Sequence, residues 1–341
     1  MTAQPAYDAL LVVSFGGPEG PDDVVPFLEN VTRGRGIPPE RLAEVGAHYL
    51  LFGGVSPINA QCRELVAALR VELRDSEHDL PVYWGNRNWH PMLADTIRTM
   101  RDDGVRRALA FVTSAWSSYS ACRQYLDDIE AARAIVGPDA PTVDKIRQFF
   151  DHPGFIEPMA DNLRAALARA GVDAHDPSTR LLFSAHSIPG SMAGTSDYVV
   201  QLHEAARLVA TMNEIDTYEI VYQSRSGPPS VPWLEPDVGD RIEALAMEGI
   251  TTVVVVPIGF ISDHMEVVYD LDTLAAQRAR DCGVRFERAS TVGVEPRFVA
   301  MIRELVEERF ATSIPQRTLG DLGVRPDRCA PGCCPAPTRS R

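Results

Sequence analysis

The hydrophobic positions of the chain fall into short, uninterrupted apolar runs, each followed by a loop rich in glycine or proline. Residues 10–14 (LLVVS) lead into the loop 15–18 (FGGP). Residues 181–184 (LLFS) lead in the same way into the loop 185–190 (AHSIPG). A strand with one face in water would alternate apolar and polar residues, so these continuous runs predict strands that are buried on both faces.

A second pair of apolar runs repeats this arrangement later in each half of the chain. Residues 108–114 (ALAFVTS) and 253–258 (VVVVPI) each follow an amphipathic stretch with helical periodicity, at 91–101 and 238–247 respectively. Strands that alternate with helices are typical of parallel sheets covered by helices on both faces. The pattern therefore predicts the α/β class with a doubly wound, Rossmann-like topology.

The spacing of the repeated runs indicates a duplicated domain rather than a short-period solenoid, because the two pairs are 171 and 145 residues apart. We expect two similar domains at residues 1–150 and 151–315, each with a parallel sheet, and a ligand-binding cleft between them. We expect His152-Pro153-Gly154 to break the chain at this boundary, and residues 316–341 to form a cysteine-rich extension.

Composition and charge exclude several classes of protein. The 341 residues are 45% hydrophobic and 23% charged, which is ordinary for a globular protein and excludes a disordered chain. The 33 basic residues against 47 acidic ones give a net charge of −14, which argues against a nucleic-acid partner. No signal peptide and no apolar run of about 20 residues is visible, so we expect a cytoplasmic protein without a transmembrane segment.

The loops that follow the predicted strands carry the candidate chemistry. The first loop, FGGP at 15–18, matches neither GxGxxG nor GxxxxGK[ST], so a tight turn is a better interpretation than a nucleotide site. The second places His186 directly after a strand, at the edge where ligands bind in this fold class. An imidazole accepts a proton at neutral pH, although a lone histidine is more often structural.

A third loop, at 259–262 (GFIS), is followed by an acidic stretch. Ser262 is expected to cap a helix that begins at Asp263, which would place Asp263, Glu266 and Asp270 on one helical face beside His264. A solvated acidic face is the simpler interpretation of such spacing. Carboxylates together with imidazole at a strand end, however, suit a labile divalent metal ion.

The cysteines are distributed unevenly. Three of the six, Cys329, Cys333 and Cys334, lie within the last 13 residues. In a cytosolic chain, such clustering indicates a metal or cluster site before it indicates disulfides.

Six segments, read in order, resemble the ferrochelatase family of class II chelatases, which insert ferrous iron into a porphyrin. The resemblance covers nearly the whole chain, and the motif details look most like the actinobacterial coproporphyrin III branch. The segments are LLVVSFGGPEGPDDVVPFL from Leu10, GGVSPINAQ from Gly53, GNRNWHP from Gly85, LLFSAHSIP from Leu181, VYQSRSGPPSVPWLEP from Val221 and PIGFISDHMEVVYDLD from Pro257.

The resemblance implies roles for particular residues. His186 matches the active-site histidine of the family and Glu266 the glutamate opposite it, so both are expected to be catalytic and to handle the metal. Our hypothesis is that His186 accepts pyrrole protons while Glu266 escorts the iron or the departing protons. Phe15 stands where some bacterial relatives carry a tyrosine that faces the metal. The expected porphyrin-binding residues are Phe15, Arg33, Arg35, Tyr49, Ser56 and Tyr125.

The same resemblance implies the substrates, Fe²⁺ and coproporphyrin III, and the product Fe-coproporphyrin III, an intermediate of haem b biosynthesis. Residues 51–80 contain no apolar insertion of the kind that forms a membrane-facing lip in animal ferrochelatases, which fits the more soluble coproporphyrin III. The alternatives are a protoporphyrin IX ferrochelatase, a cobaltochelatase that uses His264 as a second histidine, and a non-catalytic tetrapyrrole carrier. Transient contacts with other haem-pathway enzymes are also expected.

Some ferrochelatases bind a [2Fe–2S] cluster through C-terminal cysteines and one further cysteine. By this resemblance the ligands here are expected to be Cys122, Cys329, Cys333 and Cys334. A zinc site and a frayed tail with spare thiols are the alternatives, since four thiolates alone do not distinguish zinc from a cluster.

Overall fold

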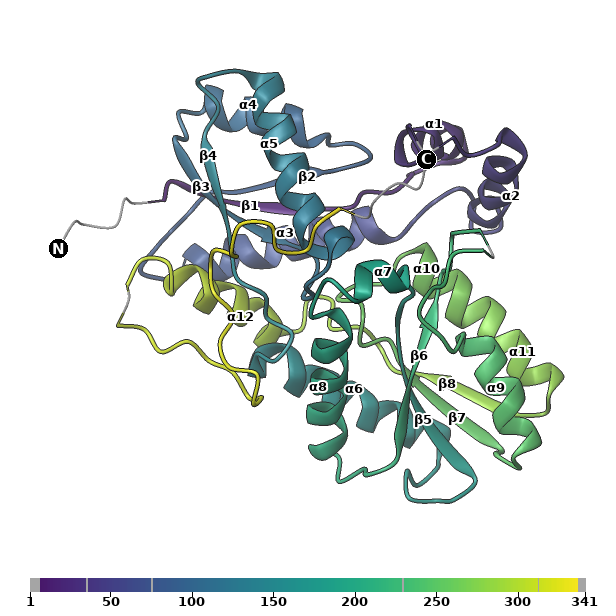
Figure 1. Cartoon of the computed structure of the whole chain (residues 1–341). Coiled ribbons are helices and arrows are strands. Elements are labelled where there is room, and N and C mark those ends of the chain that lie inside the picture. Colours follow the sequence, from purple (N-terminus) through teal and green to yellow (C-terminus); the bar gives the residue numbers. More distant parts are fainter. Residues whose placement is uncertain (1–6, 35, 75, 229, 312, 337–341) are drawn as a thin grey trace. The chain divides into compact units, whose positions relative to one another are not determined.

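The structure is a computed structural model that describes residues 7–34, 36–74, 76–228, 230–311 and 313–336. The chain divides into two compact units, each built from several segments (Figure 1). Unit 1 comprises Met1–Thr113, Tyr125–Ile146 and Ile302–Pro315, and unit 2 comprises Ser114–Gln124, Arg147–Met301 and Gln316–Arg341. The units are therefore interleaved in sequence, whereas the predicted domains 1–150 and 151–315 are contiguous.

Unit 1 contains a parallel sheet with the strand order β2-β1-β3-β4. Helices α4 and α5 pack on one face of this sheet, and Figure 1 shows α3 on the other. All six residues of β1 are buried, as the continuous apolar run predicts. The elements are β1 (Ala9–Ser14), α1 (Pro21–Val31), α2 (Pro39–Leu50), α3 (Ile58–Arg74), β2 (Val82–Asn86), α4 (Leu93–Asp102), β3 (Arg107–Val112), α5 (Gln124–Val136) and β4 (Thr142–Lys145).

Unit 2 contains a second parallel sheet, with the order β6-β5-β7-β8. Helices α6 and α8 cover one face, and α9 and α11 cover the other (Figure 1). The elements are η1 (Tyr119–Arg123), α6 (Pro153–Ala170), β5 (Thr179–His186), α7 (Gly190–Ala193), α8 (Tyr198–Thr211), β6 (Tyr218–Gln223), α9 (Val238–Met247), β7 (Thr252–Val256), α10 (Met265–Val267), η2 (Val268–Ala275), α11 (Ala276–Asp281) and β8 (Arg285–Arg288), followed by α12 (Pro296–Glu307), whose residues are shared between the units.

The two sheets have the same topology, which confirms the predicted doubly wound α/β fold. In each sheet, the first strand in the sequence, β1 or β5, is an inner strand. Strands that come later in the chain pair with it on both edges. The strand order therefore reverses between β1 and β3 and between β5 and β7. Loops at the carboxyl ends of such central strands are left uncovered by the crossover helices, so ligands bind there.

Two predicted local structures are wrong. His152-Pro153-Gly154 does not break the chain, because proline is compatible with the first turn of a helix and α6 begins at Pro153 with His152 as its N-cap. The helix expected from Asp263 begins at Met265 instead. His264 is the N-cap of this helix, and its Nδ1 accepts a hydrogen bond from the backbone N–H of Glu266.

The helices are of ordinary length for a globular protein. The two longest described helices are α6, with 18 residues, and α3, with 17. Within the described ranges, no helix is both long enough and apolar enough to cross a membrane.

Candidate active site

His186 is the last residue of the central strand β5 and is held by contacts on two sides. Its backbone pairs in register with Gln223 of β6, and its carbonyl oxygen accepts a hydrogen bond of 2.9 Å from the hydroxyl of Tyr198. The Nδ1 atom of the ring contacts the backbone oxygen of Ser187. A carbonyl oxygen only accepts, so Nδ1 carries the proton of the neutral ring and leaves the lone pair on Nε2.

The carboxylate of Glu266 faces this nitrogen. Its Oε1 lies 3.3 Å from Nε2 of His186, and its backbone oxygen accepts a hydrogen bond from the side chain of Gln223. The side chains of His186 and Glu266 are 32% and 47% exposed, so the pair is open to solvent on one side. The structure thus brings together the two residues predicted to be catalytic, one from the end of β5 and one from α10, which follows β7.

The charges of the two groups determine their protonation. Burial lowers the pKa of His186, but the negative charge of Glu266 and the hydrogen bond to it outweigh burial and raise the pKa to about 9. Burial raises the pKa of Glu266, but the imidazolium of His186 brings it down to about 2. Near neutral pH the pair therefore holds one proton, on the imidazole, and the carboxylate is ionised.

Asp270 extends the acidic region by one helical turn. Its Oδ2 accepts a hydrogen bond from the hydroxyl of Ser224. Burial, reinforced by the charge of Glu266, raises the pKa of Asp270 to about 7. Burial lowers the pKa of His264, which favours a neutral ring beside Glu266. Asp270 and His264 therefore offer a carboxyl group that titrates near neutrality and an imidazole that stays uncharged.

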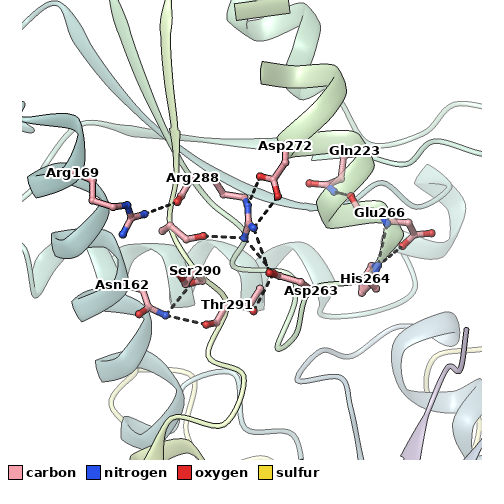
Figure 2. A network of polar contacts seen from close by, with 11 residues as sticks. Asn162, Arg169, Gln223, Asp263, His264, Glu266, Asp272, Arg288, Ser290 and Thr291 are labelled. Carbon is pink, nitrogen blue, oxygen red and sulfur yellow. Dashed lines mark hydrogen bonds and ion pairs between the residues drawn. The ribbon is translucent and has the colours of Figure 1, made fainter. Parts of the chain in front are cut away.

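Asp263 does not share a helical face with Glu266 and Asp270, contrary to prediction. Residues 263 and 264 precede the helix, so the i, i+3 spacing has no geometric meaning there. The Asp263 carboxylate instead accepts hydrogen bonds from Arg288 and from the hydroxyl of Thr291 (Figure 2).

The residues predicted to bind the porphyrin lie in unit 1, except for Arg35, which lies outside the described residues. Phe15 and Tyr49 both pack edge-on against Phe27, with ring centroids 6.3 and 5.8 Å away. Arg33 lines a cavity of about 490 Å³ together with Trp89 and His90. Phe15, at the carboxyl end of β1, is 37% exposed and so presents an aromatic surface to a ligand.

Ser56 is buried against the first loop. A Cβ atom at Gly17 would lie 2.7 Å from the Cβ of Ser56, so the glycine allows the two backbones to approach closely. At Gly16, φ is +84°, a conformation that favours glycine, as expected for the tight turn predicted from FGGP.

Arg87 is a buried residue of this region that was not predicted from the sequence, and its side chain is only 4% exposed. Its guanidinium lies 4.4 Å from the ring centroid of Tyr125 and 5.7 Å from that of Phe15, and it forms an ion pair with Asp128. It follows the last residue of β2, in the motif GNRNWHP. The criterion that selected His186, a polar residue directly after a strand, also selects Arg87.

Within unit 2, Trp116 and Tyr198 contact the segments that carry His186 and Glu266. Nε1 of Trp116 donates a 2.9 Å hydrogen bond to the carbonyl oxygen of Gly259, in the loop that leads from β7 to Glu266. The Trp116 ring also packs edge-on against Tyr198, whose hydroxyl binds His186. No sequence signal marked these residues, because their role arises from contacts between segments far apart in the chain.

The four cysteines expected to bind a cluster approach one another in unit 2. Burial raises the pKa of Cys333, whose thiol also interacts with those of Cys329, Cys334 and Cys122. Burial, followed by the charge of Cys122, raises the pKa of Cys334. Contacts including the ion pair between Arg325 and Asp197 hold this extension on unit 2. Among the described residues, however, no three His, Cys, Asp or Glu side chains form a ready-made site for one metal ion.

Comparisons with known proteins identify the family of the chain. A model of the ferrochelatase family matches residues 7–310. The chain is 53% identical over 350 residues to a coproporphyrin III ferrochelatase of Nocardia farcinica, covering 98% of both proteins. It is 55% identical over 359 residues to a coproporphyrin III ferrochelatase of Frankia alni, covering 100% of this chain and 90% of that protein. It is 53% identical over 335 residues to a ferrochelatase of Rhodopirellula baltica, covering 98% and 95%.

Solved structures show the same fold at low sequence identity. SirB from Bacillus subtilis with Fe³⁺ matches with a TM-score of 0.56 at 12% identity, covering 92% of this chain and 99% of SirB. CbiX, described as the terminal enzyme of sirohaem biosynthesis in denitrifying bacteria, matches with a TM-score of 0.51 at 14% identity, covering 88% and 98%. These matches support the fold alone.

Proposed function

The chain belongs to the ferrochelatase family, and from this premise we propose that it inserts Fe²⁺ into coproporphyrin III to give Fe-coproporphyrin III in haem b biosynthesis. The name of the two actinobacterial relatives supports the choice of coproporphyrin III. The main observation behind the catalytic proposal is the pair of His186, at the carboxyl end of β5, and Glu266, in the helix α10 that follows β7. Nε2 of His186 and Oε1 of Glu266 are 3.3 Å apart.

Metal insertion replaces the two inner N–H protons of the porphyrin by iron, so the protein must receive two protons. His186 is protonated while it faces an ionised Glu266 alone. An Fe²⁺ ion that reaches the Glu266 carboxylate opposes the positive charge of the imidazolium and lowers its pKa. Once His186 has released its proton, the Nε2 lone pair is a base for the pyrrole N–H. Asp270, with a pKa near neutrality, is placed to pass protons onward.

Unit 1 contains arginine and aromatic side chains of the kinds that bind the carboxylates and the flat ring of a porphyrin. Coproporphyrin III carries four propionates, and the exposed guanidinium of Arg33 is a suitable partner for them, while the buried Arg87 pairs with Asp128 and packs against the rings of Phe15 and Tyr125. The ring of Phe15, which is 37% exposed, offers an apolar face for a flat macrocycle, and the buried ring of Tyr125 packs against Arg87 beside it. We assign Phe15, Arg33 and Tyr125, together with Tyr49 and Ser56, to porphyrin binding.

The experiment that tests this function follows anaerobic Fe²⁺ insertion by absorbance, with coproporphyrin III and protoporphyrin IX in parallel. Faster turnover with coproporphyrin III supports the proposal, and a preference for protoporphyrin IX overturns the substrate. Faster insertion of Co²⁺ than of Fe²⁺ in parallel assays would identify a cobaltochelatase. Tight binding of the metallated product without turnover would identify a carrier. His186→Ala should abolish insertion and retain porphyrin binding, whereas His175→Ala, at an exposed position, should leave both unchanged.

We also propose that Cys122, Cys329, Cys333 and Cys334 hold a [2Fe–2S] cluster. The donor set supports this, because the thiol of Cys333 interacts with those of Cys329, Cys334 and Cys122. Cys122, Cys329, Cys333 and Cys334 would hold the cluster through their thiolates. It would supply a redox-sensitive link between the C-terminal extension and the rest of unit 2.

The cluster proposal is tested on protein purified anaerobically, by visible absorption, EPR after reduction, and iron, sulfide and zinc analysis. Equal iron and sulfide with an EPR signal supports the cluster. Stoichiometric zinc, or no metal, overturns it. Cys122→Ser should remove the signal, and Cys282→Ser, at an exposed position on the C-cap of α11, should retain it.

A further inference from the structure

The segment that carries Glu266 is tied to the sheet by Arg288, the last residue of β8 (Figure 2). Nη1 and Nη2 of Arg288 lie 3.2 and 3.3 Å from the two carboxylate oxygens of Asp263. Nε and Nη2 lie 2.6 and 2.9 Å from those of Asp272. The guanidinium therefore binds two carboxylates at once, each through two hydrogen bonds.

The two carboxylates bracket the residue that faces His186. Asp263 precedes Glu266 by three residues, and Asp272 follows it by six. Both are bound to the same planar group, so Arg288 closes residues 263–272 into a loop anchored on β8. The Arg288 side chain is only 15% exposed, which limits the competition of water for these hydrogen bonds.

The local backbone is not regular enough to fix Glu266 by itself. Residues 259–264 are not helical, α10 is only three residues long, and the π-helical η2 follows directly. A π-helical turn departs from the regular α-helical hydrogen-bond pattern and is often found at functional sites. The orientation of Glu266 therefore depends on contacts from outside its own helix. Those observed are Gln223 to its backbone oxygen, the His264 cap, and the Arg288 anchor on both sides of it.

We propose that Arg288 is a positioning residue for the iron-handling side of the reaction, fixing the Glu266 carboxylate opposite His186 through Asp263 and Asp272. The inference rests on the proposed function, in which Glu266 receives the iron. Partners that orient a metal-binding side chain without touching the metal commonly contribute 10- to 100-fold to metal affinity or activity. Loss of Arg288 should therefore weaken the use of iron and leave the binding of porphyrin unchanged.

The neighbouring Arg169 provides a matched control. It extends from α6 to the same strand β8, where it forms an ion pair of 2.7 Å with Glu287 and donates to the backbone oxygen of Arg288. It makes these contacts without involving residues 263–272. Arg169→Met therefore removes an arginine tie to β8 while leaving the anchor of Glu266 in place.

The experiment compares Arg288→Met, Arg288→Lys and Arg169→Met in the full-length protein. The measurements are kcat, the KM for Fe²⁺, the KM for coproporphyrin III, and the melting temperature. In Arg288→Met we expect the KM for Fe²⁺ to rise about tenfold or more, with less than a twofold change in the KM for porphyrin. Arg288→Lys should be intermediate, because an ammonium retains the charge but not the two-pronged geometry. Arg169→Met should match the parent protein.

A metal-binding measurement and a second variant test the positioning role independently of turnover and of the folding of Arg288→Met. Binding of Co²⁺, followed by its visible absorption without turnover, should weaken in Arg288→Met; this readout separates the positioning role from a failure of the proposed activity. If Arg288→Met does not fold, Asp272→Asn removes one half of the anchor and should weaken Co²⁺ binding in the same direction. Unchanged metal binding in a folded variant, or equal loss for iron and porphyrin, overturns the proposal.

Discussion

The hydroxyl of Tyr198 donates a hydrogen bond of 2.9 Å to the carbonyl oxygen of His186, so the first turn of α8 is tied to the end of the strand that carries the His186 imidazole. Tyr198 is buried, and burial raises the pKa of its hydroxyl, which therefore remains a donor throughout the working pH range. The position of the imidazole is thus set partly by a side chain that does not touch its ring.

Replacing Tyr198 by phenylalanine tests this tie. The variant leaves the carbonyl of His186 without this donor, at a cost of about 0.5–1.5 kcal/mol. We expect kcat for iron insertion to fall by about 2- to 10-fold with little change in the KM for porphyrin. Tyr218→Phe, at the opposite end of the β5–β6 pair, is the control and should keep kcat unchanged. An unaltered kcat in a folded Tyr198→Phe variant would show that the hydrogen bond has no role in turnover.

The ion pair between His186 and Glu266 predicts a pH dependence with a definite sign. The carboxylate raises the pKa of His186 to about 9, so below that pH the imidazole must lose a proton before it can act as a base. We expect kcat/KM for Fe²⁺ to rise with pH between 6 and 8.5 under anaerobic conditions. In Glu266→Gln the charge that raises the pKa most is lost, while burial, the contact with Ser187 and the charge of Asp270 remain, so the pKa should fall well below about 9.

Nitrogen NMR of the histidine side chains measures this change directly. The His186 signal should titrate near pH 9 in the parent protein and at a clearly lower pH in Glu266→Gln. Glu287→Gln, on β8, is a control that removes a carboxylate outside the pair. A His186 titration that does not move in Glu266→Gln would remove the electrostatic basis of the proposed mechanism.

The burial of His152 predicts how the free energy of unfolding changes as the pH falls. Burial lowers the pKa of this N-cap histidine to about 3, whereas the unfolded chain has a value near 6.5. Between these values the unfolded chain binds a proton that the folded chain does not. The free energy of unfolding should therefore fall as pH drops below about 6.5, with a slope approaching 1.4 kcal/mol per pH unit from this group.

Urea unfolding between pH 7.5 and 5 checks the contribution of His152. His152→Asn keeps a side-chain oxygen that can accept from the backbone N–H of Gly154 but removes the titrating ring, so its stability should depend less on pH. His175→Asn, at an exposed position, should retain the slope of the parent protein. Identical slopes for His152→Asn and the parent would assign the acid sensitivity to other groups.

The close packing of Gly259 against Ala185 predicts that a side chain added at Gly259 will disturb the site. An added Cβ would lie 2.7 Å from the Cα of Ala185, the residue before His186, so a methyl group must push the β7 loop away from β5. We expect Gly259→Ala to lower insertion activity at least tenfold and to lower the melting temperature by several degrees, in line with overpacking costs of about 1–3 kcal/mol. Gly20→Ala meets no atom within 4 Å and should resemble the parent. Parent-like activity in Gly259→Ala would mean that the loop yields without disturbing His186.

The sequence by itself predicted the class of fold, which the structure confirms, and pointed to His186 and Glu266, which the structure brings together. Continuous apolar runs are a local property, and those at 10–14, 181–184 and 253–258 became the buried strands β1, β5 and β7. The helix expected at 238–247 is α9 without a change of bounds. His186 was identifiable because a strand end in this class of fold is where ligands bind, and Glu266 because the motif around it resembles the family.

Only the tertiary structure decided which polar groups are paired. The carboxylates of Asp263, Glu266 and Asp270 are close in sequence. Nevertheless, Asp263 forms an ion pair with Arg288, while Glu266 faces His186. That choice depends on an arginine 25 residues after Asp263, on another strand, and on a helix that begins two residues later than its spacing suggests. The hydrogen bonds of Trp116 and Tyr198 and the gathering of Cys122 with the C-terminal thiols have the same origin. Apolar periodicity depends only on residues that are neighbours in the sequence. The partner of a charged side chain depends on which residues, distant in the sequence, the folded chain places within a few ångströms of it.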